Sequence, residues 1–174
     1  MDTTATLGTL LEADGTWTLR FERRLRHPIE KVWRALIEPE HRDVWFPQKI
    51  EGELVAGGDL AYVADQNYED FSMTGRCLVV EPPHRLELEW GDDVLRIELV
   101  EDGEGTRMTF TDRIGERRHA ARTGSGWHHC LDVLAAMLDG DPRPQVTEQD
   151  WDDLHQRYLD TVGGDRHTWG ADPD

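Results

Sequence analysis

Three consecutive stretches in the second half of the chain alternate between apolar and polar residues. They span residues 85–91, 93–101 and 105–113, and their alternating apolar positions are Leu86, Leu88, Trp90, Leu95, Ile97, Leu99, Met108 and Phe110. Successive side chains of a strand point to opposite faces, so this period of two predicts strands with one buried and one solvated face. The turn signals GDD and DGEG between the stretches indicate antiparallel neighbours. Such a sheet needs a cover for its apolar face.

The stretch GWHHCLDVLAAMLDG, residues 126–140, supplies that cover. Its apolar positions recur at intervals of three and four, as on one face of a helix: Trp127, Leu131, Leu134 and Leu138. Thr123 or Ser125 can serve as N-cap, and Gly140 is suited to end the helix. We therefore expect a helix beginning near Trp127 that lies across the sheet.

A strand and two short helices precede this region. Residues 16–25 alternate apolar and polar side chains, which predicts a strand. Pro28 suits the first turn of a helix, and apolar residues follow it at helical spacing as far as Ile37. Residues 40–47 predict a second short helix, which Pro47 stops.

The middle of the chain has the character of a β-hairpin followed by a meander. Gly57 and Gly58 form a turn signal between two predicted strands at residues 53–55 and 60–63. A further strand is predicted at 71–81, before the three alternating stretches. The expected fold class is therefore α+β, with strand one, two short helices, a six-stranded antiparallel meander and a long helix.

This order of elements resembles the helix-grip fold of the START-like, or SRPBCC, superfamily. Three stretches are similar to the branch named for homologues of the activator of the 90-kDa heat-shock chaperone ATPase: RLRHPIEKVWRALIEPEHRDVWFP, GELVAGGDLAY and GWHHCLDVLAAML. The resemblance covers about residues 16–140 and implies a curved sheet wrapped around the long C-terminal helix. It also implies a cavity between them that often takes an apolar or aromatic small molecule. It implies no reaction, because one fold serves many functions.

The candidate ligand-binding residues are large apolar or aromatic side chains, and one histidine, expected along this cavity. They are Trp17, Trp45, Phe46, Tyr62, Met73, Trp90, Met108, Trp127, His128 and Leu131. Trp127 also begins the stripe that packs on the sheet, so a core role is the preferred interpretation, and the two roles can coincide because the cavity is a gap in the core. The loop ADQNYEDF, residues 64–71, is either a rim of the cavity or a solvated acidic loop. Asp112 and Arg113 end the last strand.

The histidines of GWHHCLD do not predict a reactive centre. His129 and Cys130 are neighbours on a helix and point about 100° apart, which excludes a local thiol–imidazole dyad. His128 and Asp132 lie one turn apart and can pair, either as a tautomer-fixing pair or as a weak helix pair. The sequence contains no Ser–His–Asp order, no phosphate loop and no zinc motif HExxH, and TGSG lacks the spacing of a nucleophile elbow. We assign no catalytic residue, metal or cofactor.

Composition narrows the partners and the compartment. The formal net charge of −17 repels nucleic acid and anionic membranes, so we expect neither as a partner. Cys77 and Cys130 are too few for a disulfide framework and are expected to be reduced thiols. No apolar run approaches the length of a membrane span, and the N-terminus lacks the features of a secretory signal. The expected location is the cytoplasm.

The sequence divides into a START-like domain, residues 1–140, and a tail, residues 141–174. Within the tail, DPRPQ is a linker, and TEQDWDDLHQRYLDTVG predicts an amphipathic helix capped by Thr147 and Asp150. Its apolar stripe comprises Trp151, Leu154, Tyr158 and Val162. We expect this stripe to pack on the domain, with a homodimer contact as the alternative. The final stretch GGDRHTWGADPD is expected to be disordered.

Three functional hypotheses stay open at this stage. The first is a module that binds an apolar or aromatic small molecule in the cavity. The second is a co-chaperone-like or regulatory protein that docks a basic partner on its acidic surface. The third is an enzyme of the cyclase or hydrolase kind that uses the same cavity.

Overall fold

A curved antiparallel sheet forms the centre of the molecule. The structure, a computed structural model, describes residues 6–64 and 72–165, and within these residues eight strands follow the order β1-β2-β8-β7-β6-β5-β4-β3. The strands are β1 (Thr9–Ala13), β2 (Thr16–Leu25), β3 (Lys49–Glu51), β4 (Asp59–Val63), β5 (Met73–Glu81), β6 (Arg85–Trp90), β7 (Asp93–Asp102) and β8 (Gly105–Ile114). Every pair of neighbouring strands is antiparallel. The rim loop expected at 64–71 and the disordered end expected at 163–174 lie largely outside the described residues.

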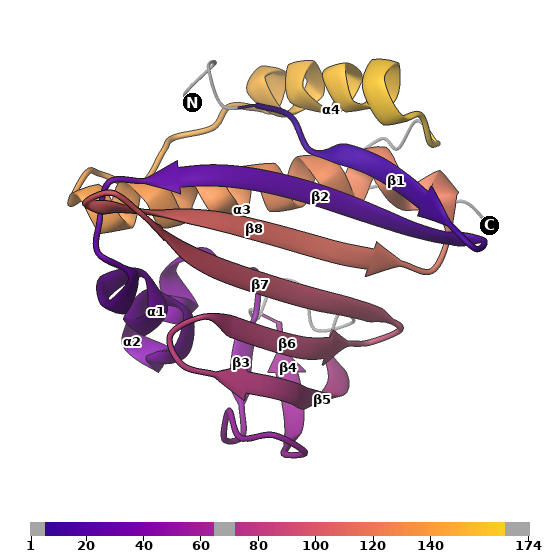
Figure 1. The fold of residues 1–174 in the computed structure, drawn as a ribbon. Helices are drawn as coiled ribbons and strands as arrows, with labels where there is room; N and C mark the ends of the chain where they lie inside the picture. Colours follow the sequence, from indigo (N-terminus) through magenta and orange to yellow (C-terminus); the bar gives the residue numbers. More distant parts are fainter. Residues whose placement is uncertain (1–5, 65–71, 166–174) are drawn as a thin grey trace.

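The helices occupy three positions around the sheet. They are α1 (Ile29–Ile37), α2 (Pro39–Trp45), a 3-10 turn at Arg117–His119, α3 (Ala120–Asp139) and α4 (Glu148–Val162). In Figure 1, α3 runs across the sheet behind β2 and β8, α1 and α2 lie at one end, and α4 lies on the far side of α3 from the strand β7. A curved antiparallel sheet wrapped around a long helix is the helix-grip fold, as predicted.

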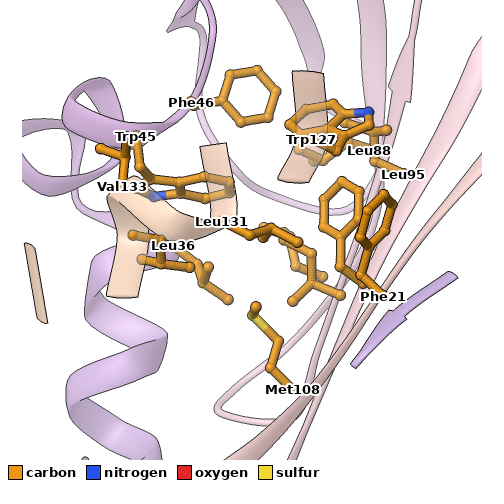
Figure 2. Close-up of a cluster of buried hydrophobic side chains, with 14 of the residues drawn as sticks. Phe21, Leu36, Trp45, Phe46, Leu88, Leu95, Met108, Trp127, Leu131 and Val133 are labelled. Atoms are coloured by element: carbon orange, nitrogen blue, oxygen red, sulfur yellow. The ribbon is translucent and has the colours of Figure 1, made fainter. Parts of the chain in front are cut away.

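The core lies between α3 and the inward face of the sheet. The alternating positions predicted to be apolar are buried on β6, β7 and β8, among them Leu88, Leu95 and Met108. Trp127 and Leu131 approach them from α3, while Val133 of the same helix lies near Trp45, as Figure 2 shows. The alternation in the sequence therefore reports the buried face correctly, because the strands pair without a shift of register between β6, β7 and β8.

Helix α3 begins earlier than the sequence predicts. It starts at Ala120, and the two residues expected as N-caps, Thr123 and Ser125, lie inside it. The Ser125 hydroxyl donates to the carbonyl oxygen of Ala121 at 2.7 Å, so it does not cap the helix. Apart from Arg122, its first two turns are made of small residues, which carry no hydrophobic periodicity. The end of the helix is as predicted, since Gly140 takes the left-handed conformation that terminates it.

Two features of the strand pattern differ from the prediction. The strand that pairs with β4 is β3, and residues 53–55 instead form a turn, in which the amide of Val55 donates to the carbonyl of Glu53 at 2.9 Å. The physical reason is burial, because Ile50 of β3 is 6% exposed whereas Val55 is 51% exposed. The sequence analysis also missed β1, an exposed edge strand with no apolar alternation. Asp14 and Gly15, both with positive φ, join it to β2.

Helix α4 packs back on α3 and shares its core. Thr147 and Asp150 form the predicted capping box, in which the Asp150 amide donates to Thr147 Oγ1 at 3.2 Å. Leu154, Tyr158 and Val162 of the predicted stripe are buried. The homodimer considered as the alternative is therefore not needed to cover this stripe.

The close approach of α4 depends on a glycine in α3. A Cβ atom at Gly124 would lie 2.7 Å from Cδ1 of Tyr158, whereas a Cβ atom at Gly126 would have no neighbour within 4 Å. The aromatic ring of Tyr158 thus rests directly on the α3 backbone. Gly124 is required for packing, and Gly126 is not.

We predict opposite effects of alanine at these two positions. Gly124→Ala should lower the free energy of unfolding by about 1–3 kcal/mol, because the added methyl group displaces Tyr158. Gly126→Ala should leave it unchanged or raise it by up to about 1 kcal/mol, because alanine favours the helix. Urea unfolding followed by circular dichroism measures both. Equal effects of the two substitutions would contradict the packing described for α4.

Candidate functional site

Aromatic rings from separate elements meet around Trp127 of α3. The Trp127 ring centroid lies 4.7 Å from that of Phe110, 5.2 Å from that of Trp90 and 5.5 Å from that of Phe46. Tyr62 stacks on Phe46 at 6.1 Å. We call these five residues the Trp127 cluster. Figure 2 shows Phe46 and Trp127 at one end of the buried side chains. The cluster joins α3 to the segment after α2 and to strands β4, β6 and β8.

Each polar side-chain atom of the cluster donates a hydrogen bond to a residue outside the cluster. Trp90 Nε1 donates to Gln48 Oε1 at 2.7 Å, and the Tyr62 hydroxyl donates to the Glu89 carbonyl at 2.6 Å. Trp127 Nε1 donates to Asp112 Oδ2, also at 2.7 Å. Buried indole and phenol groups need such partners, because an unpaired buried donor destabilises the folded state.

Asp112 is the unusual member of this network. The residue is 0% exposed, and no hydrogen-bond partner of its Oδ1 atom exists among the described residues. Burial is the main cause that raises the pKa of Asp112, and the nearby carboxylate of Asp93 adds to it, while the Trp127 N–H bond acts in the opposite direction; together they bring the pKa to about 8. The carboxyl group is therefore mostly neutral at pH 7, and a neutral carboxyl group can donate a hydrogen bond.

The sequence analysis missed Asp112 although a signal for it was present. Met108, Phe110 and Ile114 occupy alternate positions of β8 and are buried, so Asp112 falls on the same inward face. The analysis placed Asp112 at the end of the strand, where a charged residue is ordinary. In the structure Asp112 lies within β8, on the inward face of the strand, where its carboxyl group meets Trp127 of α3.

Nine of the ten predicted ligand-binding residues belong to one continuous core or pack against it, Trp17 at its edge among them. Four of them are in the Trp127 cluster: Phe46, Tyr62, Trp90 and Trp127. Four others lie in the same core outside the cluster: Trp45, Met73, Met108 and Leu131. The Trp45 ring lies 5.5 Å from Phe46, and its Nε1 atom donates to the Ala35 carbonyl. The predicted set is thus largely brought together, between the sheet and α3.

Trp17 and His128 have different surroundings. Trp17 is half-buried near the end of the sheet, where the Arg117 guanidinium lies 5.4 Å from its ring centroid. His128 faces α4, and its ring centroid lies 5.8 Å from that of Tyr158. The reason is helical geometry, because consecutive residues of a helix point about 100° apart. With Trp127 directed to the sheet, His128 is directed away from the cluster.

His128 is part of a buried hydrogen-bonded chain. The Gly8 amide donates to the Tyr158 hydroxyl at 2.8 Å, and that hydroxyl lies 3.0 Å from His128 Nδ1. Tyr158 therefore donates to Nδ1, which leaves the proton of the imidazole on Nε2, 3.6 Å from Asp132 Oδ2. The predicted pairing of His128 with Asp132 is present. Burial lowers the pKa of His128 to about 4, with a further contribution from Arg23, so the imidazole is neutral.

A groove of about 1090 Å³ lies elsewhere on the molecule. It lies between the second half of β2, the turn from β7 to β8 and the second half of α3, and none of the ten predicted residues lines it. Its charged lining residues are Glu22, Asp102, Glu104, Asp132, Asp139, Asp141, Arg23, Arg24 and Arg26. Arg24 and Arg26 are paired with Asp102 and Asp139 at 3.1 and 3.6 Å. A charged open groove of this kind suits water and ions and not an apolar ligand.

One surface group within the described residues has donor atoms close enough for a metal ion. Glu38, Glu40 and His41 have ligand atoms within 4.8 Å of one another. His41 Nε2 is already 3.3 Å from Glu38, which also accepts a hydrogen bond from Arg34 at 2.9 Å. Internal ion pairs therefore account for this group.

Comparison with known proteins agrees with the fold. The helix-grip arrangement places the chain in the START-like, or SRPBCC, class. More narrowly, the model of the family described as "Activator of Hsp90 ATPase homolog 1-like protein" matches residues 26–139, so the chain belongs to this family. A search of curated proteins found no match. Within the described residues, no helix has the length and apolar character required to cross a membrane.

Several solved structures share the fold. CalU16 from Micromonospora echinospora superposes with a TM-score of 0.73 at 23% identity, over 89% of this chain and 95% of CalU16. The protein encoded by BPP1335 of Bordetella parapertussis gives 0.69 at 26% identity, over 97% of this chain and 99% of that one. DynU16, described as a putative protein in the dynemicin biosynthetic locus, gives 0.63 at 23% identity, over 74% of this chain and 49% of DynU16.

We predict that the neutral state of His128 makes the fold sensitive to acid. The pKa of His128 in the folded chain, about 4, is below the ordinary histidine value of 6.5. The unfolded chain therefore binds a proton first as the pH falls, and the stabilisation present above pH 6.5 is lost towards pH 4. The contribution to the slope is at most about 1.4 kcal/mol per pH unit.

His128→Gln isolates this contribution. The loss of unfolding free energy between pH 7 and pH 4.5, measured by urea titration, should be smaller for His128→Gln than for the unmodified protein. His41→Gln, on the surface, is the control and should follow the unmodified protein. The same pH dependence in all three proteins would show that His128 is not held neutral by burial.

Proposed function

We propose that this protein binds an apolar or aromatic small molecule between the sheet and α3, at the Trp127 cluster. One observation supports this proposal above the others. A fully buried carboxyl group, Asp112, lies against aromatic rings with one oxygen that has no hydrogen-bond partner among the described residues. Buried polar atoms without a partner are uncommon in folded proteins, and we propose that the bound molecule pairs with this one.

The composition of the cluster favours an apolar ligand with a flat ring system. Trp90, Trp127 and Phe46 offer ring faces and edges from three separate elements. Their own polar atoms are already paired within the protein, so the rings contribute mainly dispersion and hydrophobic contact. Small-molecule sites commonly combine such an apolar wall with a few polar groups that set the orientation.

The relatives support the same class of function. The cavity between the sheet and the long helix is the site that the superfamily resemblance implies. DynU16, which shares the fold, is described as a protein of a biosynthetic locus, which is a setting for small-molecule chemistry. The charged groove beside β2 has no comparable apolar wall, which is why we place the ligand at the Trp127 cluster.

The proposed contacts come from the predicted set. Trp90 and Trp127 would form the walls, with Phe46 and Tyr62 at the closed end and Asp112 as the polar group. Trp45, Met73, Met108 and Leu131 would support these walls from the core. Trp17 and His128 are not proposed as ligand contacts, because they lie against Arg117 and Tyr158.

We predict that a ligand bound in the host survives gentle purification. Native mass spectrometry of the protein from its own host should show a stoichiometric adduct, and denaturation should release it for identification. Trp90→Leu should reduce the bound fraction about tenfold, because it removes one aromatic wall of the site. Trp17→Leu is the matched control, since it removes a half-buried tryptophan outside the cluster, and it should keep the adduct.

Two results would contradict the proposal. One is an adduct that Trp17→Leu and Trp90→Leu lose equally, with melting temperatures equal to that of the unmodified protein. The other is a protein that carries no adduct and whose tryptophan fluorescence is not quenched when it is titrated with flat aromatic compounds.

A further inference from the structure

We propose that Asp112 donates a hydrogen bond from Oδ1 to an uncharged carbonyl oxygen of the bound molecule, so that the ligand class is aromatic ketones, quinones and lactones. This inference rests on the proposed function, because it assumes a ligand at the Trp127 cluster. It adds a chemical requirement that aromatic contact alone does not impose. Asp112 becomes the residue that determines specificity.

The hydrogen bond from Trp127 determines which oxygen of the neutral Asp112 carboxyl group carries the proton. Asp112 Oδ2 accepts the Trp127 N–H bond at 2.7 Å, and an indole nitrogen can only donate. A proton on Oδ2 would compete with that bond. The proton of the neutral carboxyl group is therefore on Oδ1, the atom without a partner among the described residues.

Among the described residues, no positively charged group contributes to the pKa of Asp112. Asp112 is paired across the sheet with Leu19 of β2 and Leu95 of β7, both buried, and it meets Trp127 of α3. The charged group that acts on it is Asp93 of β7, which is itself acidic and accepts a hydrogen bond from the Gly115 amide at 3.0 Å. A second negative charge in this position favours the neutral acid, in agreement with a pKa of about 8.

The O–H group of Asp112 needs an acceptor on the bound molecule. A hydrocarbon leaves the buried O–H group unpaired, which weakens binding by the free energy of an unmade hydrogen bond. An anionic ligand would face Asp93 as well as an apolar wall, and burying its charge there is unfavourable. A neutral carbonyl oxygen on a flat ring satisfies the donor and fits the aromatic surroundings. Sites with a buried hydrogen-bonding group reject analogues that lack the matching group.

A matched pair of probes tests the inference. Fluorenone and fluorene are flat three-ring molecules of nearly the same shape. Fluorenone has a carbonyl group where fluorene has a methylene group. The unmodified protein should bind fluorenone about tenfold more tightly than fluorene at pH 6, as measured by quenching of tryptophan fluorescence. At pH 9.5 this preference should disappear, because an ionised Asp112 repels the carbonyl oxygen.

Two variants of Asp112 separate donation from shape. Asp112→Asn keeps an acceptor for Trp127 and an N–H donor for the ligand, and it does not titrate. It should prefer fluorenone at both pH values. Asp112→Leu has no donor and should bind the two probes equally. If Asp112→Leu does not fold, the pH comparison between Asp112→Asn and the unmodified protein still tests the inference.

The outcomes distinguish this inference from the proposed function. Equal binding of fluorenone and fluorene by the unmodified protein at pH 6 overturns the role of Asp112 and leaves ligand binding in place. Binding of neither probe contradicts both. A readout without any ligand is the carbon-13 titration of the Asp112 carboxyl group, for which we expect a midpoint near 8. A midpoint below about 5, close to that of an ordinary aspartate, would overturn the inference.

Discussion

The contact between α3 and the inward face of the sheet is the interaction on which the other features depend. The strands present one apolar face, and an antiparallel sheet of this kind is stable only when another layer covers that face. Trp127, Leu131 and Leu134 provide the cover and are almost completely buried. Helix α3 runs along β2 and β8, behind them in Figure 1, and α1 and α2 lie at one end of the sheet.

Helix α3 is buried on two sides, and this explains the attachment of α4. Its side opposite the sheet carries Gly124 and His128, against which Tyr158 packs. The chain from Gly8 through Tyr158 to His128 ties the start of the described chain to both helices. The capped helix α4 would be marginal by itself at 15 residues, so its buried stripe is what stabilises it. The tail is thus part of the same core as the START-like domain.

The polar groups within the core are of two kinds. His128 is hydrogen-bonded to Tyr158 through Nδ1, and its Nε2 atom lies 3.6 Å from Asp132 Oδ2, so it contributes to the packing of α3 against α4. Asp112 has a partner on one oxygen only, and it lies beside aromatic rings of the Trp127 cluster. That difference in hydrogen bonding, more than residue type, separates a structural group from a candidate for recognition. Membership of the family of activator homologues agrees with the fold. It does not by itself specify a function, which has to be argued from local contacts such as these.

The amino-acid sequence by itself determined the elements whose signals are local. The alternation along β6, β7 and β8, the capping box of Thr147 and the glycine that ends α3 are predicted correctly because strand period, caps and turns depend on neighbouring residues. Tertiary structure decided the early start of α3, the choice of β3, the direction of His128 and the burial of Asp112. Each of these depends on which segment, distant in the sequence, covers the residue. The residues next to it in the sequence do not reveal that segment. A carboxyl group near a strand end is solvated in most proteins, but Asp112 is a buried acid because Leu19 and Leu95 flank it on the neighbouring strands and α3 brings the Trp127 side chain over it.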